Sequence, residues 1–213
     1  MNFITEIVYM LSAATLLAAF YILLQPFIKS MIQAIITQSV FIGLISFAMA
    51  YYMNSLDFVL LGILVVALRG FLVSYLLERQ IPKRNELFRE HTNGTSSTLL
   101  TALVLAVIVI LVVYFYVFSG LVANAEFGNT IIVFPFVVIF LGIFQILARR
   151  NTLAHIIGYV EQENGMVLMS IFLIPVPFIV ELSVFLDVIA LVLIAAIVAK
   201  ETTEHKIMRE LRG

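Results

Sequence analysis

Residues 151–199 read NTLAHIIGYVEQENGMVLMSIFLIPVPFIVELSVFLDVIALVLIAAIVA, an apolar stretch that also carries acidic side chains. About 20 helical residues cross the hydrocarbon core of a bilayer, so this stretch is too long for one span. Pro175 and Pro177 interrupt it, and a proline lacks the amide donor and disfavours helix in the residue before it. The stretch therefore predicts two membrane helices, 151–174 and 177–199, joined by a hairpin.

The composition of the whole chain also indicates a lipid-embedded protein. Of its 213 residues, 63% are apolar and 12% are charged, whereas soluble proteins have roughly 45–50% and about 25%. With no Cys, the chain supplies neither a disulfide nor thiolate ligands for an iron–sulfur cluster. A net charge of −1 without a long basic run argues against nucleic acid as a partner. We expect no soluble catalytic domain, no cofactor and no metal site.

Five further apolar stretches precede this pair and are bounded by charged or turn residues: 3–24, 31–53, 57–77, 97–119 and 129–148. The first stretch is not a cleaved signal, because it lacks a basic leader and carries Glu6. The sequence thus predicts an all-α polytopic membrane protein with seven transmembrane helices.

The cations predict the orientation of these spans. Eleven of the twelve Lys and Arg fall in segments that the alternating spans assign to one side: Lys29, Arg79, Lys83, Arg84, Arg89, Arg149, Arg150, Lys200, Lys206, Arg209 and Arg212. The segments on the opposite side contain none. By the positive-inside rule the N-terminus lies outside and the C-terminus is cytoplasmic.

A polar insert with charges of both signs separates two groups of spans. Such mixed charge is typical of a solvated connector, although a surface helix over 82–91 is an alternative. The predicted organisation is a three-helix front bundle, a cytoplasmic connector, a four-helix back bundle that contains a three-helix unit at 129–199, and a cytoplasmic tail: 1–77, 78–97, 98–199 and 200–213.

The twelfth cation, Arg69, lies within the span 57–77. A charge near the bilayer centre costs about 2.5–3.5 kcal/mol on insertion scales and usually implies an internal partner or a wet cavity. The alternative is a side chain that snorkels roughly 12 Å to the cytoplasmic rim. Because arginine does not release its proton at physiological pH, we expect a fixed charge that favours the ionised form of a neighbouring carboxylate.

The last two spans carry acidic side chains at Glu161, Glu163, Glu181 and Asp187. Successive helical residues rotate by 100°, so Glu161 and Glu163 point about 200° apart and cannot share one environment. Carboxyl groups spaced along bundle helices can form a proton relay. The alternative is that they are protonated or hydrogen-bonded and hold helices together.

Two further polar positions accompany the acids. His155, near the start of its span, is either a relay member or an interfacial histidine. The span 31–53 opens with Gln33, Thr37, Gln38 and Ser39, and Gln38 is a candidate lining residue of a polar path. The candidate proton relay is thus Glu163, Glu181, Asp187, Glu161 and His155.

The motif RRNTLAHIIG at 149–158, followed by Asn164, resembles the turn and second helix of the small three-helix membrane subunit shared by respiratory complex I and multisubunit Na+/H+ antiporters. GYVEQENG at 158–165 and VELSVFLDVIALVL at 180–193 are closer still to component E of hydrogenase-4-type complexes. The resemblance is specific over 145–213.

The resemblance implies that Glu163 and Glu181 stand for that family's second-helix and third-helix glutamates, with Asn164 as polar lining. One departure is Val160, which occupies the place of the three-helix subunit's glutamate, so Glu163 is displaced by one turn. Arg69 stands near the place where component E proteins tend to have a lysine.

The resemblance also implies a function. We expect a non-redox membrane subunit of a complex I-like energy-converting complex, a group 4 [NiFe]-hydrogenase or a related oxidoreductase, in the cytoplasmic membrane of a prokaryote. It would have no catalytic centre of its own and would couple electron transfer to proton or Na+ translocation. Its expected partners are antiporter-like membrane subunits and the hydrogenase or iron–sulfur subunits of a peripheral arm. A free-standing ion-coupled transporter and a structural scaffold subunit are the alternatives.

Overall fold

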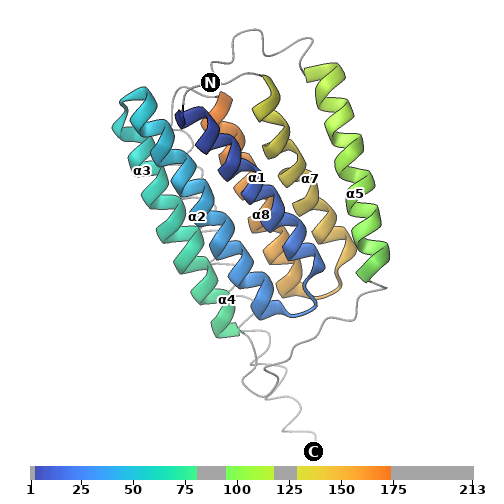
Figure 1. The fold of residues 1–213 in the computed structure, drawn as a ribbon. Helices are drawn as coiled ribbons and strands as arrows, with labels where there is room; N and C mark the ends of the chain where they lie inside the picture. The colour runs from blue at the N-terminus through green and yellow to red at the C-terminus, as the bar shows by residue number, and fades with distance from the viewer. Residues whose placement is uncertain (1–2, 81–94, 118–128, 174–213) are drawn as a thin grey trace, which may run out of the picture.

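The computed structural model describes residues 3–80, 95–117 and 129–173 of the chain (Figure 1). These residues are almost entirely helical and contain no strand. The expected span 177–199, with Glu181 and Asp187, lies outside the described residues.

The described residues form helices in all three stretches of the chain. In chain order they are α1 (Phe3–Leu24), α2 (Ile28–Met53), α3 (Leu56–Leu64), the π-helical segment η1 (Val65–Val73), α4 (Ser74–Gln80), α5 (Thr95–Val112), the π-helical segment η2 (Val113–Val117), the 3-10 turn η3 (Asn129–Ile132), α7 (Val133–Ala148) and α8 (Thr152–Leu173). Helices α3 and α4 are the two ends of one continuous rod whose middle is η1. The turn between α2 and α3 is closed by Asn54, which adopts the left-handed conformation (φ 50°) and donates its backbone N–H to Ala50 O.

Five of these helices are long and apolar enough to cross a membrane, which confirms a polytopic helical membrane protein. They cover Phe3–Leu24, Ile28–Met53, Leu56–Arg79, Ser97–Tyr116 and Thr130–Ala148. Helix α8 has 22 residues, as many as α1. It is more polar than these five helices, because it carries Glu161, Glu163 and Asn164. Helix α2 begins at Ile28, three residues before the expected start, since exposed Lys29 lies at the solvated end of the helix.

The helices run alternately up and down and form one bundle (Figure 1). Helices α1, α2, α7 and α8 make up its centre: α8 packs on α7 and α2, and α1 packs on α2 and α7. The rod α3–η1–α4 flanks α2 on one side, and α5 flanks α7 and α1 on the other. Helices from either side of the polar segment 78–97 therefore pack against one another.

Glycines bring α7 and α8 into close contact. A Cβ atom on Gly142 would lie 2.5 Å from Gln162 N, and one on Gly165 would lie 2.8 Å from Ile139 N. Small residues of this kind let two membrane helices approach backbone to backbone. The contact fixes the register of α8 against α7 and with it the positions of the acidic side chains on α8.

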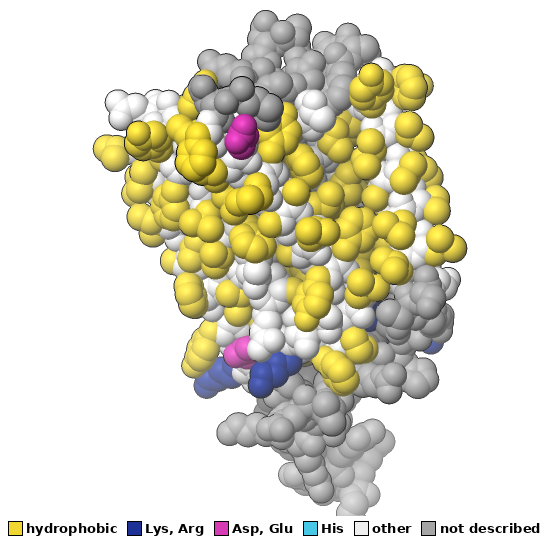
Figure 2. All heavy atoms as spheres, in the orientation of Figure 1, with side chains coloured by type: hydrophobic (Ala, Val, Ile, Leu, Met, Phe, Trp, Pro, Cys, Tyr) yellow, Lys and Arg dark blue, Asp and Glu magenta, His cyan; other side chains and the backbone are white. Residues whose placement is uncertain are grey.

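Charge and apolar surface are separated on the bundle. On the face shown in Figure 2, hydrophobic side chains cover its length, and Lys and Arg side chains lie at one end. Lys29 lies in the first turn of α2, Arg79 lies in the last turn of α4, and Arg149 and Arg150 follow α7. These helix termini share one end of the bundle (Figure 1). Within residues 3–80, 95–117 and 129–173, Arg69 is the cation that departs from this arrangement.

Candidate functional site

An ion pair lies in the interior of the bundle, between η1 and α8. Arg69 Nη2 is 3.2 Å from Glu163 Oε2, and each side chain is 1% exposed. Taking two opposite charges out of water costs several kcal/mol per ion, which their attraction offsets only when the geometry and the remaining hydrogen bonds are good. The pair therefore depends on the polar groups around it.

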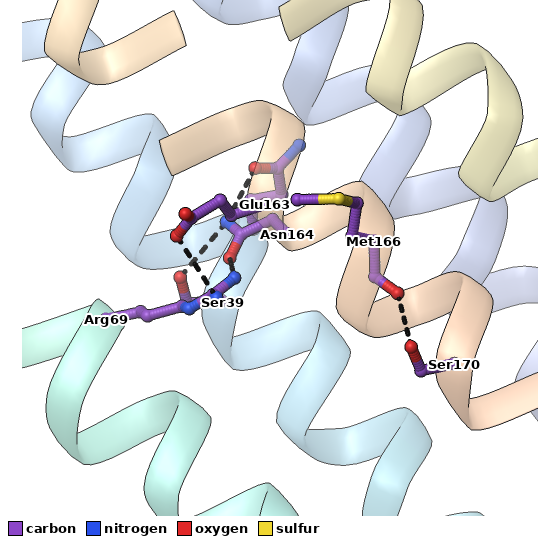
Figure 3. A network of polar contacts seen from close by, with 7 residues as sticks. Ser39, Arg69, Glu163, Asn164, Met166 and Ser170 are labelled. Carbon is purple, nitrogen blue, oxygen red and sulfur yellow. Dashed lines mark hydrogen bonds and ion pairs between the residues drawn. The ribbon is translucent and has the colours of Figure 1, made fainter. Parts of the chain in front are cut away.

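Asn164 supplies the first of these polar groups (Figure 3). Arg69 Nη1 donates to Asn164 Oδ1 at 3.3 Å, so one guanidinium reaches two consecutive residues of α8. The side-chain amide of Asn164 donates in turn to Gln38 Oε1 at 2.9 Å and to Ser39 Oγ at 3.3 Å, both on α2. Asn164 thus joins the charged pair to α2.

Gln38 carries the network on to α1. Its Nε2 donates to the backbone carbonyl of Thr15 at 3.4 Å. Gln38, Ser39 and Asn164 are each 0% exposed. The resulting polar cluster, which we call the Arg69 network, comprises Arg69, Glu163, Asn164, Gln38 and Ser39 and ties together α1, α2, η1 and α8.

The local backbone explains how Arg69 reaches α8. It lies at the middle of η1, and π-helical turns interrupt the regular α-helical spacing and are frequent at functional sites. The hydroxyl of Ser74 donates to the backbone carbonyl of Arg69 at 3.5 Å, five residues back along the chain. On α8, Asn151 Oδ1 accepts the backbone N–H of Leu153 at 2.9 Å and starts the helix that presents Glu163.

The other sequence-predicted residues are not in this network. Glu161 is 0% exposed, but neither of its carboxyl oxygens finds a hydrogen-bond partner in the part of the chain that the structure describes. His155 Nε2 is 2.6 Å from Arg149 O at the start of α8, about 9 Å along the helix from Glu161 at 1.5 Å per residue. The structure therefore brings together Arg69, Glu163, Asn164 and Gln38 and keeps Glu161 and His155 apart from them. Glu181 and Asp187 lie outside the described residues.

The buried polar residues that were not among the predicted site residues include Ser39, Arg149 and Gln145. Ser39 belonged to the polar opening of the second span, without a signal that it would contact Asn164. Arg149 is 4% exposed and donates through Nη2 to the backbone carbonyls of Leu23 and Gln25. It thereby satisfies carbonyls that the end of α1 leaves open. Gln145, on α7, is 0% exposed.

The acidic and histidine side chains of the described residues do not gather into a metal-binding group. Among the described residues, no three or more His, Cys, Asp or Glu side chains gather closely enough to hold a metal ion. Among the described residues, the Arg69 network offers a guanidinium, a carboxylate, two neutral amides and the hydroxyl of Ser39.

Comparison with known proteins yields one named relative. The chain is similar to a mycobacterial protein. That protein is designated "Uncharacterized protein Rv0085" in Mycobacterium tuberculosis, and the two are 30% identical over 150 residues, which is 68% of this chain and 65% of the relative. The match thus spans less than two thirds of the relative's length. No protein-family model and no solved structure matches the chain. The evidence for a function therefore comes from the residues of the chain itself, above all the Arg69 network.

Proposed function

We propose that this chain is a non-redox membrane subunit of a complex I-like energy-converting complex, in which it couples electron transfer in partner subunits to the translocation of protons or Na+. The observation that supports this proposal most directly is the buried pair of Arg69 and Glu163. Ionisable residues inside membrane helices are expensive and mark ion pathways by default. The resemblance of 145–213 to component E of hydrogenase-4-type complexes supports the choice of complex, a group 4 [NiFe]-hydrogenase or a related oxidoreductase.

In this proposal Arg69 is a fixed positive charge and Glu163 is the group that exchanges a proton. Opposite charges in a low dielectric couple strongly at short range, so a change of field or hydration caused by a redox event would shift the balance between the paired and the protonated carboxyl. Asn164 accepts from Arg69 and donates to Gln38, so these neutral amides hold the guanidinium in place while the carboxyl changes its state. Glu181 and Asp187 would continue the path, with His155 and Glu161 on the cytoplasmic side.

The proposed topology has seven spans, with α8 as the sixth and 177–199 as the seventh. The N-terminus would lie outside and the C-terminus in the cytoplasm of a prokaryote. The gathering of Lys29, Arg79, Arg149 and Arg150 at one end of the bundle supports this orientation through the positive-inside rule.

The exposed apolar surface is consistent with a subunit that meets lipid and other membrane chains. Leu100 on α5 is 65% exposed, and Tyr114 and Phe115 on η2 are 61% and 64% exposed. Such a surface suits antiporter-like membrane subunits, with the hydrogenase or iron–sulfur arm on the cytoplasmic side.

The test is to extract the native protein gently and identify every co-purifying chain by native mass spectrometry. We expect antiporter-like membrane subunits together with a nickel–iron or iron–sulfur arm. A single chain or a homo-oligomer that persists across extraction conditions would overturn the proposal and favour a free-standing transporter.

A further inference from the structure

Two buried polar side chains, one on α7 and one on α8, have no hydrogen-bond partner among the described residues. Glu161 and Gln145 are each 0% exposed. Within residues 3–80, 95–117 and 129–173, no hydrogen bond reaches either carboxyl oxygen of Glu161 or either polar atom of the Gln145 amide. Leaving a buried polar group unsatisfied costs about 1–3 kcal/mol, and native proteins contain few such groups. Two of them on neighbouring helices need a physical explanation.

Helices α7 and α8, which carry these two residues, pack closely against one another (Figure 1). Gln145 Cγ lies 2.8 Å from the place that a Cβ of Gly158 would occupy. Glu161 is three residues after Gly158 and four before Gly165, and both glycines face α7, so Glu161 shares the α8 face that contacts α7. Three residues of helix are about 4.5 Å along the axis. The backbone of Glu161 therefore lies within one helical turn of Gly158, the place on α8 that Gln145 contacts.

This place is separate from the Arg69 network. Glu161 and Glu163 point about 200° apart on α8, and it is Glu163 that meets Arg69. The two glutamates of α8 thus have different surroundings, although one residue separates them in the chain.

Within the part of the chain that the structure describes, no cation on α7 or α8 pairs with Glu161. Helix α7 contains no Asp, Glu, Lys, Arg or His. On α8 the other titratable groups are Glu163, held by Arg69, and His155, at the start of the helix. At the end of α7, Arg149 is engaged with backbone carbonyls of Leu23 and Gln25. An ionised carboxylate at Glu161 would therefore be an uncompensated buried charge among the described residues, which is strongly unfavourable.

We propose that Glu161 is a proton-holding site, present as the carboxylic acid, and that Gln145 and one ordered water complete its hydrogen bonds. A carboxylic acid offers one O–H donor and acceptor oxygens, and an amide offers donors and an acceptor. A buried water that makes two to four hydrogen bonds can join the two groups. Gln145 is then a positioning residue, and α8 carries one ionised glutamate toward η1 and one protonated glutamate toward α7. This site is distinct from the Arg69–Glu163 pair, and a proton held at Glu161 can be tested whether or not the chain couples electron transfer to ion translocation.

The test is infrared spectroscopy of the purified full chain in lipid at neutral pH, in H2O and D2O. Spectra of wild type minus Glu161→Gln should show a carboxylic acid C=O band that shifts to lower wavenumber in D2O. The Glu78→Gln variant, changed at an exposed position, should keep this band. Gln145→Met, similar in length but apolar, should shift the band to higher wavenumber because a hydrogen-bond partner is lost.

Each contrary result overturns a stated part of the proposal. If the difference spectrum contains only carboxylate bands, Glu161 is ionised and holds no proton. If Gln145→Met leaves the band in place, Gln145 does not position the acid. Loss of the band on adding NaCl, but not choline chloride, would make this a sodium site instead. Should Glu161→Gln fail to fold, Glu161→Asp replaces it, and we expect that variant to retain a displaced acid band.

Discussion

Arg69 Nη2 approaches Glu163 Oε2 to 3.2 Å, while Nη1 of the same guanidinium bonds Asn164, 95 positions away in the chain. The contact joins η1, before the polar segment 78–97, to α8, well after it. Because buried ion pairs often contribute little net stability compared with apolar side chains of similar volume, packing alone does not account for this pair. The proposed role in ion translocation accounts for a charge pair in a membrane interior better than packing does.

Glu163→Gln is the first variant to make. It keeps the size of the side chain but removes its ability to ionise, so ion translocation coupled to electron transfer in membrane vesicles should fall to less than about a tenth of wild type. Electron transfer itself and assembly with the partner chains should persist. The matched control is Glu78→Gln on the exposed end of α4. Full pumping by the Glu163→Gln vesicles would rule out this carboxylate as an obligatory carrier.

Arg69→Met alone should lower the stability of the protein more than the double variant Arg69→Met/Glu163→Gln does. The single change leaves a buried carboxylate without its cation, and breaking a buried pair in this way costs about 3–5 kcal/mol. The double variant Arg69→Met/Glu163→Gln removes both charges and should recover much of that loss. Thermal unfolding of the four proteins in one detergent measures the coupling as a double-mutant cycle. Additive effects would mean that the two side chains do not interact in the membrane.

Asn164→Leu should weaken the connection between the charged pair and α2. It removes the acceptor for Arg69 Nη1 and the donor for Gln38 Oε1, so buried groups lose partners at about 1–3 kcal/mol each. Ser170→Ala is the control, because Ser170 Oγ donates to Met166 O within α8 (Figure 3). We expect a lower unfolding temperature for Asn164→Leu and almost none of that change for Ser170→Ala. Equal unfolding temperatures would contradict the network.

Gly142→Ala should loosen the contact between α7 and α8. The added Cβ would lie 2.5 Å from Gln162 N and 2.8 Å from Gly158 O, which are backbone atoms and cannot move aside cheaply. Overpacking of this kind costs about 1–3 kcal/mol. Gly70→Ala is the same substitution at a place where the nearest atom, Ser39 Cβ, would be 3.7 Å away. Thermal unfolding should separate the two variants, and an unchanged Gly142→Ala protein would show that the helices are not in close contact.

The described membrane helices could be predicted from the sequence, whereas the contacts of the polar side chains between them could not. Apolar length and charged boundaries were sufficient for the described membrane helices, since the cost of exposing polar backbone to lipid fixes their length. The cost of an intramembrane charge indicated that Arg69 needs an internal partner. Its partners could not be read from the sequence, because the π-helical segment alters the rotation along the helix and the register between η1 and α8 comes from packing.

The surroundings of other polar residues could not be predicted either, because they too depend on how the helices pack. Arg149 and Arg150 are adjacent and equivalent in sequence, but Arg149 is buried at the end of α1 while Arg150 is exposed. Gln145 is a single amide in an apolar helix, and its place against Gly158 of α8 comes from the packing of the two helices. Such contacts between distant segments leave no periodic trace in one sequence.

The absence of Cys makes the proposed topology directly measurable. Single cysteines introduced at Lys29, Asn54 and Thr203 would react with an impermeant thiol reagent from the side on which each lies. We expect Asn54→Cys to react in intact cells, and Lys29→Cys and Thr203→Cys to react in inside-out vesicles. Lys29 and Asn54 are at opposite ends of α2, so they report orientation, and Thr203 reports the number of spans that follow. Labelling of Thr203→Cys from outside would require an even number of spans and would place the C-terminal acids on a different path.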